Sequence, residues 1–195
     1  MKNKFDEDGY LRVENLLDEP TVKVISEYFE NKIKRGEWSP KEFVGPEDSS
    51  KFGYYADPLI EVMLARCLPV IEQEIGIFLD PTYSYARVYQ GGEELKPHTD
   101  RESCEITATV NVAFTGEPWP IWMQYKNNDP VKCVLTSGDA IVYKGREVTH
   151  WRRVLPEGEV NVQFMLHYVE KNGAFADFKL DKRRSLGMKA SLGGG

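Results

Sequence analysis

Several absences limit what this chain of 195 residues can be. It has no apolar run near the roughly 18 residues that a membrane-spanning helix needs, and its polar, acidic N-terminus has no signal-peptide core. Cys67, Cys104 and Cys133 are odd in number and show no CxxC spacing, so neither a disulfide framework nor a zinc–thiolate site is expected. We therefore expect a cytoplasmic protein with reduced thiols and no membrane association.

The chain also lacks the excess of positive charge that favours binding to phosphate backbones. It has 25 basic and 31 acidic side chains, which gives a formal net charge of −6. The most basic run, at 179–184, is short and typical of a solvated tail, so we do not expect nucleic-acid binding. Neither GxGxxG nor GxxxxGK[ST] occurs, so no nucleotide-binding loop is predicted.

What is present is enough apolar sequence for one globular domain, since 41% of the residues are hydrophobic and 12% aromatic. Apolar residues recur at helical spacing after Asp18 and again after Asp57, and each aspartate stands close to a proline in a helix-start pattern. Pro69 is expected to kink the second helix or end it early. Residues 1–80 are accordingly predicted to be supporting helices.

Beyond Pro81 the hydrophobic period changes from 3.6 to 2, which predicts strands. The clearest lies at 106–114, and turn signals separate about eight short strands in all. Evenly spaced short strands favour a jelly roll or barrel over βαβ units. We predict a single domain, mainly β with supporting α-helices, with its β core at 81–170 and a C-terminal extension at 171–195.

Two of the three histidines form a pattern with one aspartate. His98 and Asp100 point to one side if their segment is extended, and an imidazole with a hard oxygen suits iron, manganese or zinc. His150 follows about fifty residues later, a separation at which a double-layered barrel can bring the chain back beside its start. The three residues together predict a 2-His-1-carboxylate site with open metal positions, as in non-haem Fe(II) oxygenases. His-x-Asp alone would also fit a solvated surface loop.

Three longer runs surround these residues in the order RVYQGGEELKPHTD, GDAIVYKGREVTHWRR and NVQFMLHYVE. They resemble the Fe(II)/2-oxoglutarate-dependent dioxygenase superfamily, and most of all its prolyl-hydroxylase-like branch of bacterial and phage type, over about residues 80–170. The resemblance implies a double-stranded β-helix, a cupin-like barrel. It also implies Fe(II) held by His98, Asp100 and His150, with 2-oxoglutarate and O₂ as co-substrates. The implied reaction hydroxylates an unactivated C–H bond and releases succinate and CO₂.

In the family that the chain resembles, a basic residue on the last barrel strand binds the far carboxylate of 2-oxoglutarate. Here the corresponding stretch, 158–163, contains no basic residue. The alternation of side chains along a strand indicates a basic residue that could take this role. Arg152 points into the barrel if His150 does, whereas Trp151 and Arg153 then point outward. Arg152 would offer that carboxylate a planar pair of donors.

Three more residues are candidates for the co-substrate pocket. Arg87 is a second candidate for the carboxylate, Tyr89 sits where related enzymes use a tyrosine, and Asn111 could add a hydrogen bond. Surface ion pairs for the arginines and plain packing for the tyrosine stay open as alternatives. His167 is expected to be a hydrogen-bonded structural residue.

Other functions remain open at this point. One is a cupin-like metal-binding barrel that acts as an isomerase or a small-molecule binding module, although cupins usually carry more histidines. Another is a non-enzymatic interaction domain on the same scaffold. By resemblance, the leading substrate is a prolyl residue in a protein or peptide, with a free amino acid or another small molecule as alternatives. The sequence predicts neither the oligomeric state nor the role of the C-terminal extension.

Overall fold

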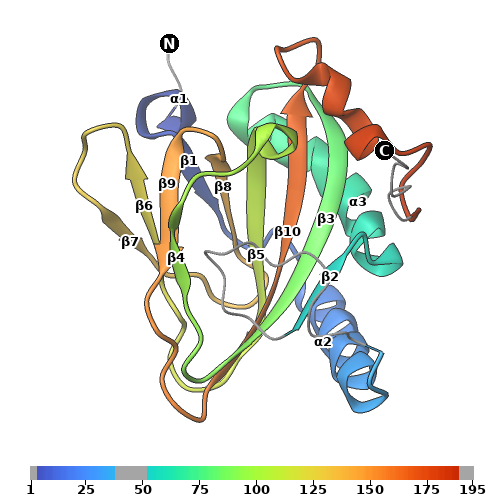
Figure 1. Cartoon of the computed structure of the whole chain (residues 1–195), viewed down its shortest axis with the longest axis vertical. Helices are drawn as coiled ribbons and strands as arrows, with labels where there is room; N and C mark the ends of the chain where they lie inside the picture. The colour runs from blue at the N-terminus through green and yellow to red at the C-terminus, as the bar shows by residue number, and fades with distance from the viewer. Residues whose placement is uncertain (1–3, 38–51, 189–195) are drawn as a thin grey trace, which may run out of the picture.

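Figure 1 shows the computed structural model of the chain, which describes residues 4–37 and 52–188. Two antiparallel sheets face each other, and two long helices cover the outer face of the larger sheet (Figure 1). In spatial order, the larger sheet contains β1 (Tyr10–Val13), β8 (Ala140–Lys144), β5 (Ile106–Phe114), β10 (Val160–Glu170), β3 (Leu79–Gln90) and β2 (Phe52–Tyr55). The smaller sheet contains β4 (Leu95–His98), β9 (Val148–Arg152), β6 (Ile121–Tyr125) and β7 (Val131–Cys133).

The helices are α1 (Lys4–Asp8), α2 (Glu19–Lys34) and α3 (Pro58–Ile75), and short 3₁₀ segments lie at η1 (Glu102–Cys104) and η2 (Ala176–Lys182). Both long helices begin where the sequence predicts, because Asp18 and Asp57 cap them with side-chain oxygens that accept backbone N–H groups. Among the described residues, no helix is both long and apolar enough to cross a membrane.

Of the two effects expected of Pro69, a kink or an early helix end, the early end is wrong, because α3 continues to Ile75. A proline within a helix removes one hydrogen bond and costs about 3 kcal/mol. Cys67 and Ile71 on either side of Pro69 are buried in the core, together with Ile75, so packing on both sides holds the helix together.

The range 1–80, predicted as supporting helices, also supplies both edge strands of the larger sheet. Strand β1 pairs with β8, and β2 pairs with β3. Each has only four residues, too few for a period of 2 to stand out in the sequence. Gly53 in β2 is required by close approach, since a Cβ there would lie 2.5 Å from the Tyr85 hydroxyl.

The basic run at 179–184 is not the solvated tail that we expected. The Arg183 guanidinium is buried against the carboxylate of Glu61 in α3, with Nη2 and Oε1 2.6 Å apart. Lys179 also pairs with Asp80, at 2.7 Å. The described part of the C-terminal extension is therefore fastened to the helical layer and to β3.

Eight strands, β3 to β10, lie between Leu79 and Glu170. The larger sheet has two different faces. The face toward α2 and α3 is apolar, with side chains such as Val88, Val110 and Phe164 in the main core. The face toward the smaller sheet carries buried polar side chains, among them Thr107, Asn111, Gln163 and His167. Burial of the apolar face stabilises the fold. This stabilisation offsets the cost of burying polar side chains between the two sheets.

We predict that Ile71→Ala lowers the free energy of unfolding by about 2–5 kcal/mol, because it removes a fully buried side chain between α3 and the sheet. Val70→Ala is the matched control on the same helix, since Val70 is 43% exposed, and it should change stability by no more than about 0.5 kcal/mol. Urea unfolding followed by circular dichroism measures both. Equal effects of the two substitutions would contradict this packing.

Candidate metal centre

The strand pairing of the smaller sheet brings the three predicted ligands together. His98 is the last residue of β4, and β4 pairs with β9 so that His98 stands directly opposite His150. Asp100 follows two residues after His98, and its backbone N–H donates to the carbonyl of Gly145 at 2.8 Å. Gly145 is needed here, since a Cβ at this position would lie 2.6 Å from the Asp100 carboxylate.

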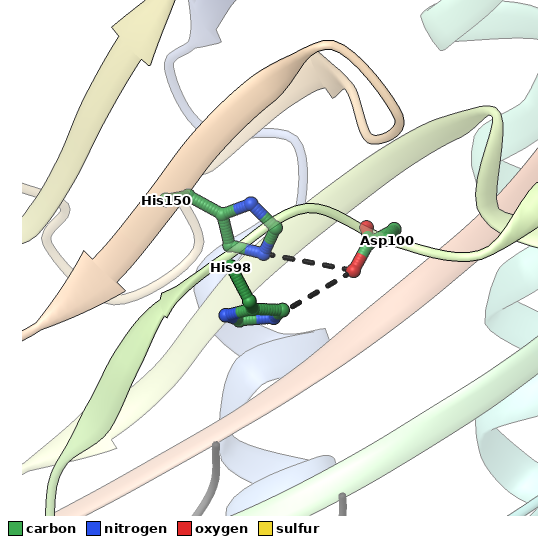
Figure 2. A group of neighbouring side chains, drawn as sticks. All are labelled: His98, Asp100 and His150. Carbon is green, nitrogen blue, oxygen red and sulfur yellow. Dashed lines mark ion pairs between the residues drawn. The ribbon is translucent and has the colours of Figure 1, made fainter. Parts of the chain in front are cut away.

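Figure 2 shows both imidazoles directed toward the Asp100 carboxylate. The Oδ1 atom of Asp100 lies 3.8 Å from Nε2 of His98 and 3.7 Å from Nε2 of His150. The three ligand atoms all lie within 4.8 Å of one another. An ion about 2.0–2.2 Å from each donor can sit between atoms at this spacing.

Backbone carbonyls fix the orientation of both imidazoles. Nδ1 of His98 lies 2.8 Å from the carbonyl oxygen of Lys96, and Nδ1 of His150 lies 3.1 Å from that of Val148. A carbonyl can only accept a hydrogen bond, so each Nδ1 carries the proton and each Nε2 presents a lone pair. Metal-ligating histidines are oriented in the same way.

The surroundings of His150 include one residue that our sequence analysis did not select. The hydroxyl of Tyr143 lies 3.3 Å from Nε2 of His150 and 3.3 Å from the Thr109 hydroxyl. Burial raises the pKa of Tyr143 well above its ordinary value, so the phenol stays neutral and can serve as a hydrogen-bond donor. Only the register of β8 against β5 brings Tyr143 here, and the sequence gives no signal for that register.

Asp100 belongs to a second group with metal-ligating side chains, together with Cys104 and His167. The hydroxyl of Thr107 lies between two members of this group, 2.9 Å from Oδ2 of Asp100 and 3.0 Å from Nδ1 of His167. Burial raises the pKa of the Cys104 thiol to about 12, so the thiol is protonated in the metal-free protein. The first group, with two imidazoles and one carboxylate, has the ligand set of the non-haem Fe(II) oxygenases, which the second group lacks.

Arg152 lies inside the barrel, on the side of β9 that carries His150. Arg152 and His150 are buried, whereas Trp151 is half-buried and Arg153 is exposed, in agreement with the predicted parity. The guanidinium lies over the Trp119 ring, 4.8 Å from its centroid, and Nη1 donates to the Trp119 carbonyl.

The charge of Arg152 is not balanced within the described structure. Its Nε and Nη2 atoms have no hydrogen-bond partner among the described residues. Burial lowers the pKa of Arg152 to about 10, which still leaves it a cation at neutral pH. A buried cation with two unpaired donors is costly, so the geometry fits a site that receives an anion.

The remaining candidates lie on the larger sheet. The buried Tyr89 ring contacts Trp119 at a centroid distance of 4.9 Å, so Tyr89 and Arg152 flank the same indole. Asn111 is buried and donates to the carbonyl of Leu135 at 3.2 Å, and its Oδ1 atom has no partner among the described residues. The guanidinium of Arg87 lies over the Tyr85 ring, 4.6 Å from its centroid.

Asn161 is a buried amide that our sequence analysis did not select. It stands beside Tyr89 in the ladder between β10 and β3, and its Oδ1 atom also lacks a partner within the described ranges. The sequence could have indicated Asn161, because it lies an even number of residues from Gln163 and His167 along β10. Residues at such spacing point to the same face of a strand, here the inner one.

No known family profile matches the chain, and no curated protein matches it. Solved structures do match. A prolyl hydroxylase from Trichoplax adhaerens, in complex with a hypoxia-inducible-factor peptide, has a TM-score of 0.71 at 13% identity, over 92% of this chain and 90% of that one. A Pseudomonas putida prolyl-4-hydroxylase has a TM-score of 0.67 at 15% identity, over 85% and 95%. A non-haem α-ketoglutarate-dependent epimerase of nogalamycin biosynthesis has a TM-score of 0.70 at 13% identity, over 94% and 89%.

The chain has the fold of the 2-oxoglutarate/Fe(II) oxygenases. The double-stranded β-helix expected from the sequence is confirmed, as is the likeness to prolyl hydroxylases. The epimerase shares this fold as closely, so the fold alone does not indicate which substrate this chain acts on.

We predict that His98→Ala and His150→Ala each weaken Mn(II) binding at least about 100-fold, because each removes a direct ligand. Thermal unfolding should show that both variants still fold, since apolar strand faces hold the barrel independently of the ligands. Arg153→Ala is the control on the solvent side of the same segment and should bind Mn(II) like the wild type. Titration followed by electron paramagnetic resonance measures the affinities. Undiminished Mn(II) binding by His150→Ala would rule out this ligand set.

Proposed function

We propose that the protein is an Fe(II)- and 2-oxoglutarate-dependent dioxygenase that hydroxylates an unactivated C–H bond. The observation that carries the proposal is the convergence of His98, Asp100 and His150 on one point. Beside it, on the same strand as His150, lies the buried guanidinium of Arg152, two of whose donors have no partner among the described residues. The likeness in fold to enzymes of this class supports it.

The donor set fits Fe(II). Two neutral imidazoles and one carboxylate would hold the ion and leave other positions open, as in non-haem Fe(II) oxygenases. When bound there, iron would supply the oxidative chemistry that turns 2-oxoglutarate and O₂ into succinate and CO₂ and hydroxylates the substrate. The contribution of the protein is the fixed ring orientation set by Lys96 and Val148.

Arg152 fits the distal carboxylate of 2-oxoglutarate. Its Nε and Nη2 atoms belong to one planar fork, so they can donate two parallel hydrogen bonds to a carboxylate. The buried cluster of Tyr89, Trp119 and Leu155 excludes water from this end of the barrel, which strengthens a charge pair. Tyr89 and Asn111 are proposed to support the co-substrate, and Arg87 is the alternative partner for the carboxylate.

As the substrate we propose a prolyl residue in a protein or peptide. Two of the similar structures are prolyl hydroxylases, one of them in complex with a peptide. A free amino acid or another small molecule is the alternative. The proposal places the protein in the cytoplasm, in keeping with three free cysteines within the described part of the chain.

Succinate production from 2-oxoglutarate under Fe(II) and O₂ tests the activity, with a proline-rich peptide, free proline or no added substrate. We expect turnover that depends on Fe(II) and is stimulated by the peptide. Stimulation by free proline alone would favour the small-molecule alternative. A protein that binds metal but neither binds nor consumes 2-oxoglutarate would instead be a cupin-like barrel of another activity.

We predict that Arg152→Ala raises the 2-oxoglutarate concentration needed for half-maximal turnover at least about 100-fold, since an unpaired buried charge costs about 3–5 kcal/mol. Arg152→Lys should recover only part of this loss, because an ammonium lacks the planar fork. Arg153→Ala is the neighbouring control and should change little, because Arg153 is exposed. If Arg87→Ala is the sensitive variant and Arg152→Ala is silent, Arg87 binds the carboxylate.

A further inference from the structure

A chain of buried polar side chains lies behind Asp100. Thr107 in β5 stands directly opposite His167 in β10, and both side chains are buried. The Thr107 hydroxyl oxygen lies 2.9 Å from Oδ2 of Asp100 and 3.0 Å from Nδ1 of His167. One hydroxyl thus connects the second oxygen of the carboxylate to an imidazole that is not part of the metal site.

The direction of each hydrogen bond follows from the number of available protons. The Thr107 hydroxyl has one proton, and the Asp100 carboxylate is a closer and stronger acceptor than the Cys104 carbonyl at 3.4 Å. Thr107 therefore donates to Asp100 and accepts from Nδ1–H of His167. Burial lowers the pKa of His167 well below its ordinary value, so this imidazole is neutral and carries its single proton on Nδ1.

His167 is itself held in place by its neighbours. Its ring lies 4.4 Å from the ring of Tyr83, measured between centroids, and Tyr83 stacks on Tyr55 at 4.9 Å. The Arg101 guanidinium lies over the Tyr83 ring, 4.7 Å from its centroid, and pairs with Asp181 at 3.2 Å. The imidazole therefore presents Nδ1 to Thr107 in a fixed direction.

A free aspartate side chain could turn and offer both oxygens to one metal ion, which would occupy one more coordination position. Here Thr107 donates to Oδ2, while Oδ1 lies 3.8 Å from Nε2 of His98 and 3.7 Å from Nε2 of His150. We propose that Thr107 and His167 are positioning residues that hold Asp100 to a single ligand oxygen and so keep the open face of the metal free for the co-substrate. This inference rests on the proposed function of the same site.

The test compares Mn(II) affinity and 2-oxoglutarate affinity in two Thr107 variants. Thr107→Val keeps the shape of the side chain and removes the hydroxyl, and we expect it to weaken Mn(II) binding about 10–100-fold. Thr107→Ser restores a hydroxyl and should bind Mn(II) within about threefold of the wild type. Thr82→Val is the matched control, because Thr82 is equally buried and its hydroxyl donates to the carbonyl of Ser103, at 2.7 Å.

His167 gives a second, independent comparison, which is decisive if Thr107→Val does not fold. His167→Asn keeps an N–H group close to the place of Nδ1, whereas His167→Leu removes it. We expect His167→Leu to weaken Mn(II) binding more than His167→Asn does, and to lower the affinity of the Mn(II)-loaded protein for 2-oxoglutarate by a larger factor.

The outcomes separate this inference from the proposed function. Wild-type affinities for Mn(II) and 2-oxoglutarate in Thr107→Val, or equal losses in the two His167 variants, would overturn the positioning role while the proposed function stands. A wild-type protein that binds no Mn(II) would overturn both. An equal loss in Thr82→Val and Thr107→Val would also overturn the positioning role, because any buried threonine would then have the same effect.

Discussion

The pairing of β4 with β9 is the constraint on which the candidate site depends. This pairing sets His98 opposite His150 across two strands, although the two residues are about fifty positions apart in the sequence. A strand shifted by one residue turns every side chain to its other face, so a slip of β9 would direct His150 and Arg152 outward together. His150 and Arg152 therefore depend on the same alignment of β9, which links the two halves of the proposed site.

The two faces of the larger sheet have different roles, one in stability and the other in the proposed site. The face under α2 and α3 is apolar and supplies the main core. The inner face carries polar groups whose burial costs free energy unless they are paired. Arg152, Asn111 and Asn161 retain polar atoms without partners among the described residues. Polar atoms without protein partners are expected at a site that a ligand completes.

The sequence predicts the features that depend on local patterns. Alternating residues identify the strands of the β core, aspartate caps identify the starts of both long helices, and parity along β9 places Arg152 with His150. Features that depend on packing or register were missed. The edge strands β1 and β2 are too short to show a period, and Pro69 lies in a helix that tertiary contacts hold together. The contact of His167 with Thr107, and through it with Asp100, becomes visible only when β10 is aligned with β5.

A crystal structure of the protein with Mn(II) and 2-oxoglutarate, grown without O₂, tests the central claim most directly. We predict one ion bound by Nε2 of His98, Oδ1 of Asp100 and Nε2 of His150, with the distal carboxylate of 2-oxoglutarate on Nε and Nη2 of Arg152. A metal ion bound elsewhere, or a triad that stays empty while 2-oxoglutarate binds away from Arg152, would contradict it.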